Sequence, residues 1–76
     1  MLISKALNIA RKELKKENIK SNIIDSEVLL SYILKKERSC LLINQDSYVL
    51  SKSKLDKFKD LIEQRKQKKP VSQIIG

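Results

Sequence analysis

Glycine and proline, the residues that most often interrupt regular structure, occur only at the far end of this chain. The single proline is Pro70 and the single glycine is Gly76, in a sequence of 76 residues. The long stretch before Pro70 therefore contains neither of the usual helix breakers. It favours an all-α fold with short polar turns between the helices.

Apolar residues in this stretch recur at the spacing of one helical face, roughly every three or four residues. The first such face contains Ile3, Ala6, Leu7, Ala10 and Leu14. Because a chain this short encloses only one small core, we expect a small bundle of about four to five helices. The expected helices cover about residues 3–17, 22–35, 39–44, 52–68 and 71–75.

The expected helix at 22–35 carries apolar residues on more than one face. These residues are Ile24, Val28, Leu29, Leu30, Tyr32, Ile33 and Leu34. Such a wide surface predicts a central helix that packs on more than one neighbour. Ser21 or Asn22 is expected to cap its start. Asp25 and Glu27 lie near that start, where they suit the positive end of the helix dipole.

The apolar run from Cys40 to Ile43 is short enough to be a strand or a helix. We expect a short helix, because a lone strand would leave its backbone groups without hydrogen-bond partners. Ser39 is a suitable cap for it. Cys40, the single cysteine, is expected to be a buried small hydrophobe rather than a reactive thiol.

The last long helix is expected to begin near Lys52. Leu50 and Leu55 flank Ser51 at the spacing of a hydrophobic staple around a helix cap. A basic cluster at the other end suits the negative end of the helix dipole. Pro70 then fits the first position of a further helical turn. The cluster consists of Lys66, Lys68 and Lys69.

Composition argues against catalysis by this chain alone. With no histidine or tryptophan and one cysteine, it lacks a disulfide framework, a metal cluster of known spacing and a Cys/His or Ser/His nucleophile pair. We therefore expect no catalytic, cofactor-binding or metal-binding residues. No apolar run approaches the ~18–20 residues that span a bilayer, and the N-terminus lacks a signal-peptide pattern. A soluble, cytoplasmic protein is expected.

The chain is strongly basic, with 17 Lys and Arg residues, 9 Asp and Glu residues and a net charge of +8. Clustered basic residues bind nucleic acid by releasing counterions from phosphates. Here lysines outnumber arginines and are spread over every segment, and few aromatic residues are available for base stacking. A solvated lysine-rich surface is the favoured interpretation. A small basic nucleic-acid-binding or ribosome-associated helical protein is the alternative, and an unrelated helical interaction domain is a third.

Three segments, taken in order, resemble a known family. They are Ile24-Asp-Ser-Glu-Val-Leu-Leu30, Arg38-Ser-Cys-Leu-Leu42, and Leu61-Ile-Glu-Gln-Arg65 followed by Pro70 and Gln73-Ile-Ile-Gly76. Their order and spacing are similar to those in the N-terminal domain of peptide chain release factor glutamine methyltransferases, the HemK/PrmC family. The chain departs from the family pattern where Ser26 replaces alanine, Lys66 arginine, Lys68 glycine and Lys69 glutamate.

The resemblance implies a division of labour between two domains. In the family, the full enzyme transfers a methyl group from S-adenosylmethionine to N5 of the glutamine in the Gly-Gly-Gln loop of class I release factors. A C-terminal Rossmann-like domain binds the methyl donor. Residues 1–76 would then be a single helical N-terminal substrate-recognition domain without catalytic activity, and the C-terminal domain is expected to be absent from this chain. The implied partners are class I release factors and that methyltransferase domain, without membranes or specific nucleic acids.

Charge and the family motifs single out two groups of residues. Lys35, Lys36 and Arg38 concentrate charge at one corner between helices and are the expected partner-binding residues. Arg65 follows an apolar stripe, so we expect its guanidinium to bind Asp25 or carbonyl groups at a helix end. For Asp25, interaction with the helix dipole is the alternative. The structural motif residues are Asp25, Arg65, Pro70 and Gly76.

Overall fold

The computed structural model describes residues 1–75, and the elements in this part of the chain are five helices. They are α1 (Ile3–Lys16), α2 (Asn22–Leu34), α3 (Arg38–Ile43), α4 (Lys52–Lys66) and α5 (Val71–Ile75). The all-α expectation is confirmed, and each helix begins and ends close to its expected range. Within the described residues, no helix is both long and apolar enough to cross a membrane. Gly76, one of the structural motif residues, lies outside the described residues.

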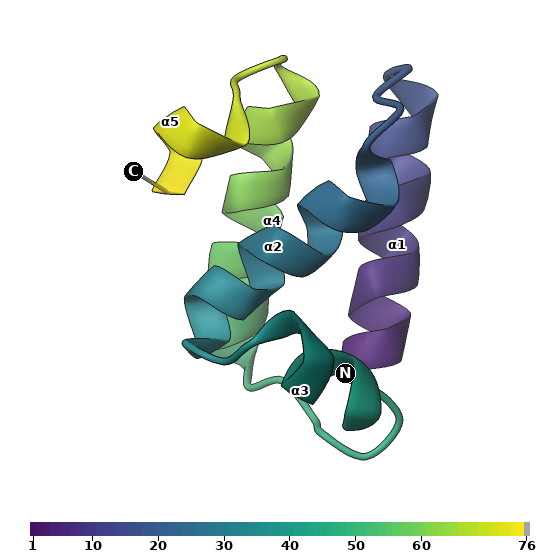
Figure 1. Cartoon of the computed structure of the whole chain (residues 1–76), viewed down its shortest axis with the longest axis vertical. Coiled ribbons are helices and arrows are strands. Elements are labelled where there is room, and N and C mark those ends of the chain that lie inside the picture. Colours follow the sequence, from purple (N-terminus) through teal and green to yellow (C-terminus); the bar gives the residue numbers. More distant parts are fainter. Residues whose placement is uncertain (76) are drawn as a thin grey trace.

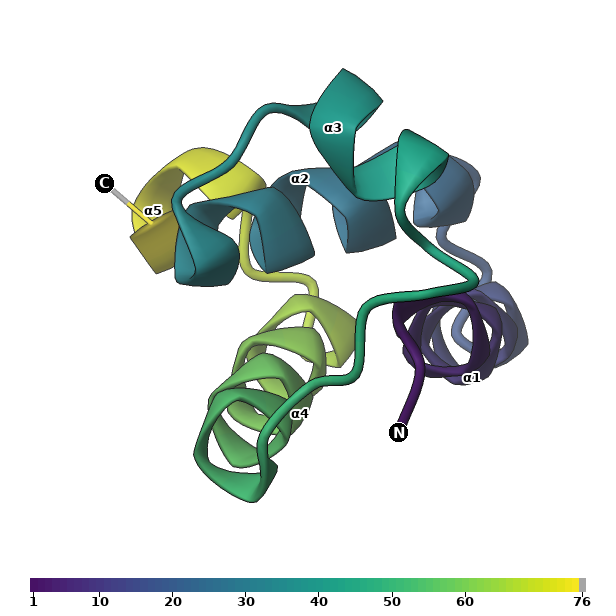
Figure 2. The same ribbon diagram turned by 90° about the horizontal axis from the view of Figure 1, so that it is seen from below.

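The helix α2 is the centre of the bundle. α1 and α4 run in the same direction, and α2 crosses in front of both (Figure 1). The view from below shows α2, α3 and α5 on one side of the molecule and α1 and α4 on the other (Figure 2). Because α2 contacts every other helix, its expected central position is confirmed.

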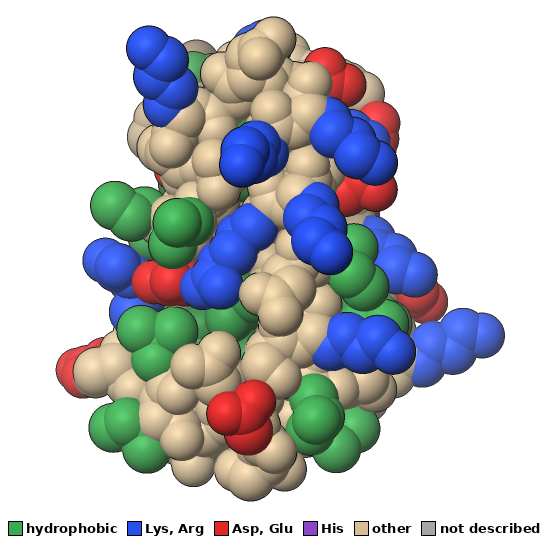
Figure 3. Space-filling view, turned by 90° about the vertical axis from the view of Figure 1, so that its right-hand side faces the viewer, with side chains coloured by type: hydrophobic (Ala, Val, Ile, Leu, Met, Phe, Trp, Pro, Cys, Tyr) green, Lys and Arg blue, Asp and Glu red, His purple; other side chains and the backbone are tan. Residues whose placement is uncertain are grey.

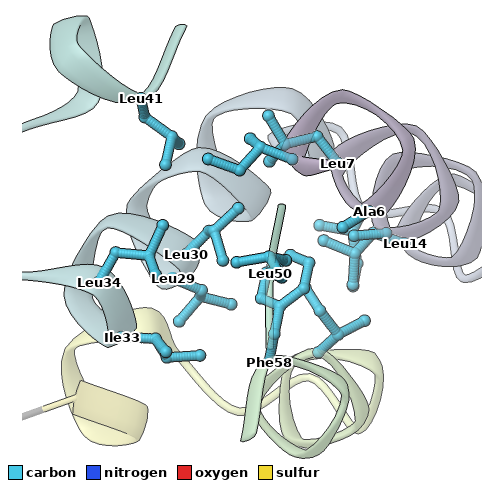
Figure 4. Close-up of a cluster of buried hydrophobic side chains, with 14 residues drawn as sticks. Ala6, Leu7, Leu14, Leu29, Leu30, Ile33, Leu34, Leu41, Leu50 and Phe58 are labelled. Atoms are coloured by element: carbon cyan, nitrogen blue, oxygen red, sulfur yellow. The ribbon is translucent and has the colours of Figure 1, made fainter. Parts of the chain in front are cut away.

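Apolar side chains from α1, α2 and α4 meet around Phe58 (Figure 4). Phe58 is 2% exposed, and Leu29 and Leu30 of α2 are fully buried. Complete burial of a side chain of this size contributes roughly 1.5–3 kcal/mol to stability. Leu41 of α3 and Leu50 of the following loop join the same cluster, which anchors both segments. The other members are Ile3, Ala6, Leu7, Ala10, Leu14, Ile19, Ile33, Leu34 and Ile62.

The expected apolar surface of α2 is wrong at Ile24 and Tyr32. Both side chains are 52% exposed, whereas Asp25, Ser26 and Glu27 are buried. The carboxylates occupy inward positions because arginines from α1, α3 and α4 reach them there. A carboxylate is tolerated at a buried position when it is paired and hydrogen-bonded. Pairing between helices thus overrides the hydrophobic pattern of α2.

The third helix is present as expected, and Leu41 is its one buried side chain, with Leu42 partly buried against the core. Leu41 is 1% exposed, whereas Ile43 is 82% exposed and Cys40 is only partly buried. A helix this short turns only one stripe toward the core, so the expectation of a buried Cys40 is wrong. α3 already begins at Arg38, so Ser39 lies inside the helix and does not cap it.

The start of α1 is held by the loop between α3 and α4. The backbone N–H groups of Ile3 and Ser4 donate to the carbonyl oxygens of Tyr48 and Gln45, at 3.1 and 2.9 Å. α1 has no side-chain cap, and these contacts supply partners for N–H groups that a helix start leaves free. Local sequence patterns do not reveal them, because they join segments far apart in the chain.

Hydroxyl groups at the starts of α2 and α4 have different roles. Ser51 Oγ accepts a hydrogen bond from the Lys54 N–H at 3.2 Å, which confirms the expected start of α4. At α2, the hydroxyl of Ser21 donates to the Asp25 carboxylate at 2.7 Å instead of capping the backbone. The expected capping role of Ser21 is therefore wrong, because its hydroxyl acts as a donor to the carboxylate and its oxygen accepts no backbone N–H.

The backbone of Lys68 is left-handed, with φ at 68°. This is the position at which the family pattern has glycine. A left-handed residue with a Cβ costs roughly 1–2 kcal/mol, whereas glycine adopts this conformation freely. The lysine adds a contact in return, because its Nζ donates to the carbonyl oxygen of Glu17 just after α1. The substitution for glycine thus keeps the turn and ties the ends of α4 and α1 together.

We expect Lys68→Gly to be more stable than Lys68→Ala by about 1 kcal/mol. Both variants lose the amine contact with Glu17, so their difference isolates the cost of the left-handed backbone. The measurement is the free energy of unfolding from urea denaturation followed by circular dichroism. Equal stabilities would contradict the left-handed turn at Lys68.

Candidate partner-binding site

Arg65 joins the end of α4 to the start of α2. Its Nε donates to Asp25 Oδ2 at 2.8 Å, and its Nη1 donates to the carbonyl oxygen of Lys69 at 3.3 Å. Both partners expected from the sequence, the carboxylate and a carbonyl at a helix end, are therefore present. The side chains of Arg65 and Asp25 are 18% and 11% exposed, so this ion pair is shielded from most of the solvent. It holds the segment that leads to Pro70 and α5.

Glu27 is the second buried carboxylate of α2, and it binds two arginines. Arg11 Nη2 from α1 lies 2.8 Å from Oε2, and Arg38 Nη2 from α3 lies 3.1 Å from Oε1. The sequence interpretation gave Glu27 only a helix-dipole role and did not foresee this junction. The available signal was a charged residue within an otherwise strongly apolar helix, since such a residue needs a partner. No comparable feature of the sequence around Arg11 indicated that it would be the partner of Glu27.

Among the expected partner-binding residues, Arg38 differs from the two lysines. Its guanidinium binds Glu27 through both Nε and Nη2, although the side chain is 48% exposed. Lys35 and Lys36 follow the end of α2 and are exposed. Neither lysine forms an ion pair within residues 1–75. The structure thus gives Arg38 an internal role and leaves Lys35 and Lys36 available to a partner.

The second basic cluster, Lys66, Lys68 and Lys69, is largely occupied by internal contacts. Lys66 Nζ lies 3.3 Å from carboxylate oxygens of both Glu13 and Glu63. The bond to Glu13, followed by that to Glu63, raises the pKa of Lys66 above its ordinary value. A raised lysine pKa leaves these pairs intact at neutral pH and weakens them only in strong alkali. This basic cluster therefore helps to hold the C-terminal ends of α1 and α4 together.

The α1 side of the molecule has no single basic stripe. Figure 3 shows Lys and Arg side chains on this face with acidic and hydrophobic side chains between them. Every arginine of the chain, namely Arg11, Arg38 and Arg65, binds a carboxylate of α2. Bidentate contact with guanine, the commonest specific contact to a base, relies on free arginine or lysine. Only lysines remain free for that purpose.

S-adenosylmethionine carries a sulfonium cation, which a free carboxylate would stabilise. The hollow between α1 and α4 contains Glu13 and Glu63, but Lys66 binds both carboxylates. A second hollow, between α2, α4 and α5, is rimmed by lysines and by one carboxylate, that of Glu37. Among residues 1–75, no three His, Cys, Asp or Glu side chains are grouped so as to hold a metal ion.

We expect Glu27 to be coupled more strongly to Arg11 than to Arg38. The Arg11 side chain is 25% exposed and that of Arg38 is 48% exposed, so water screens the second pair more. Double-mutant cycles with Glu27→Gln, Arg11→Gln and Arg38→Gln should give roughly 1–3 kcal/mol for the first pair and below about 1 kcal/mol for the second. Unfolding free energies in urea provide the measurement. A larger coupling to Arg38 would contradict this ranking.

Comparison with known proteins identifies relatives of the whole chain. The family described as the PrmC N-terminal domain matches residues 5–76. The chain is 39% identical over 74 residues to a release factor glutamine methyltransferase of Clostridium acetobutylicum and 41% identical over 63 residues to one of Clostridium botulinum. It is 34% identical over 74 residues to a bifunctional methyltransferase of Rickettsia felis. No solved structure matches it significantly.

These alignments cover most of this chain but a small part of each relative. They include 97%, 83% and 97% of the chain and 26%, 22% and 14% of the three relatives, in the same order. The chain thus spans about a quarter or less of the curated relatives that it matches. The family match extends over nearly all of the sequence, as the motifs at Asp25, Arg38 and Arg65 indicated. The chain belongs to the family of PrmC N-terminal domains, which is found in release factor glutamine methyltransferases.

Proposed function

We propose that this chain is the release factor recognition module of a methyltransferase that modifies N5 of the Gly-Gly-Gln glutamine in class I release factors. Two relatives, 39% and 41% identical to it over the aligned residues, carry the name release factor glutamine methyltransferase. In this proposal residues 1–76 bind the protein substrate and do not catalyse. A C-terminal domain binds S-adenosylmethionine and the reacting glutamine, and the reaction takes place in the cytoplasm.

The observation that carries this proposal is the contrast between the two basic corners. Lys66 at the end of α4 is paired with Glu13 and Glu63, whereas Lys35 and Lys36 at the end of α2 are exposed and have no ion pair within residues 1–75. Exposed charges without internal partners change association with another protein more than they change stability. We therefore assign the contact with the release factor to the Lys35 and Lys36 corner.

A separate recognition module has a clear physical advantage for this reaction. The glutamine to be methylated lies in a loop, and a mobile loop spends little time in the reactive geometry. Binding elsewhere on the release factor raises the effective concentration of the loop at the catalytic centre. A chain with a net charge of +8 also speeds encounter with a partner that presents an acidic surface.

We expect the double substitution Lys35→Glu and Lys36→Glu to weaken binding of this chain to a class I release factor by about tenfold or more. Arg38 is left unchanged, because a carboxylate there would face Glu27 and disturb the fold. The matched control is Lys5→Glu with Lys12→Glu, which makes the same change in net charge on the exposed surface of α1. Affinities are measured by isothermal titration calorimetry at low and physiological salt.

Two results would contradict the assignment. Equal losses in both double variants would mean that net charge alone sets the affinity. Absence of binding to the release factor by the unmodified chain, together with tight and strongly salt-dependent RNA binding, would favour the nucleic-acid alternative.

A further inference from the structure

A groove lies next to Lys35 and Lys36, where the C-terminal half of α2, the first turns of α4 and the end of α5 come together. Its apolar lining comes from Val28 and Ile33 of α2 and Ile75 of α5. Polar and charged side chains surround this apolar part. They are Ser31, Tyr32, Lys35, Lys36, Glu37, Lys54 and Lys57.

The lysines at the start of α4 are not explained by the stability of the helix. A helix start carries roughly half a positive charge, so acidic residues are favoured there and lysines are not. The first turn of α4 has no acidic residue and contains Lys52 and Lys54. Lys54 is held beside the groove, because its Nζ donates to the carbonyl oxygen of Ile33 at 3.4 Å. Lys57 forms no ion pair within the described residues.

The charges around this groove are unbalanced. Lysines stand on both sides of it, on α2 and on α4, and Glu37 is the only carboxylate in its lining. The groove between α1 and α4 differs, because there Glu13 and Glu63 accompany Lys59 and Lys66. Of these two grooves, the one between α2, α4 and α5 combines an apolar floor with an excess of positive charge. That combination favours an acidic partner.

Tyr32 adds an anchor at the edge of the groove. It is 52% exposed although α2 is the most apolar of the three long helices, and its hydroxyl makes no hydrogen bond within residues 1–75. Exposed tyrosines are enriched among residues that dominate the binding energy of protein interfaces, because an aromatic ring offers a large contact area at a low entropic cost.

We propose that this groove binds an acidic, amphipathic segment of the release factor. Apolar side chains of the segment pack on Ile33 and Tyr32, and its Asp and Glu side chains face the surrounding lysines. This inference rests on the proposed function and adds to it the place and the chemistry of the contact. A protein segment is favoured over nucleic acid because the floor is apolar, the arginines are engaged by Asp25 and Glu27, and Tyr32 is the one aromatic residue in the lining.

The test compares two lysines of the same helix. Lys57→Glu changes a residue of the proposed groove, whereas Lys59→Glu makes the same charge reversal on the side of α4 that faces the α1 groove. Both side chains are exposed, so neither change disturbs the core. A third variant, Tyr32→Ala, removes the aromatic ring and leaves the charges unchanged. Each chain is titrated with a purified class I release factor by calorimetry, and its unfolding midpoint in urea confirms that it is folded.

We expect Lys57→Glu and Tyr32→Ala each to weaken binding by about tenfold or more, and Lys59→Glu by less than about twofold. The affinity of the unmodified chain should fall with salt more steeply than that of Lys57→Glu. If all variants retain binding, or if Lys57→Glu and Lys59→Glu weaken it equally, the groove is not the binding site. The proposed function would still stand. Failure of the unmodified chain to bind the release factor would instead overturn the proposed function itself. If the unmodified chain binds an RNA oligonucleotide more tightly than the release factor, and Lys57→Glu abolishes this binding, the groove would be a nucleic-acid site instead.

Discussion

Two carboxylates on α2 determine how the other helices are arranged around it. Asp25 binds Arg65 of α4, and Glu27 binds Arg11 of α1 and Arg38 of α3. Burial of apolar surface is non-directional and would allow α2 to turn or slide against its neighbours. Ion pairs between largely buried groups have a defined geometry, and breaking one by removal of a single partner leaves a buried charge uncompensated. These pairs thus determine which face of α2 meets each helix.

The same pairs divide the basic residues into two chemical classes. The arginines are used inside the bundle, where a planar guanidinium can bind a carboxylate at more than one nitrogen. The lysines remain on the surface, as expected for a strongly hydrated ammonium group. Within the described residues, the basic side chains that form no ion pair are consequently all lysines. Where α2 and α4 approach each other beside α5, these lysines surround apolar side chains, which makes that surface suited to a protein segment rather than to a phosphate backbone.

The sequence predicted the parts of the structure that depend on local pattern. Helical periodicity identified the long helices, and Ser51 marked the start of α4 because its cap is a contact between near neighbours. The pairing of Arg65 with Asp25 was also predictable, since a guanidinium on an apolar stripe needs an acceptor. The roles of Glu27 and Arg11 were not predictable, because their pairing requires α1 and α2 to be already packed. Exposure of Tyr32 likewise depends on which face of α2 meets α1 and α4, and periodicity alone does not reveal that face.

The contacts of α5 connect the buried pairs with the groove. Arg65 binds both Asp25 and the carbonyl oxygen of Lys69, the residue before Pro70, so the path into α5 is determined by an ion pair of α2. α5 then packs on α2 and α4, and Ile75 at its end lines the groove. A segment bound in the groove would touch α5 as well as the lysines. Its binding free energy would therefore depend on the same Asp25 and Arg65 pair that organises the fold, although neither residue lines the groove.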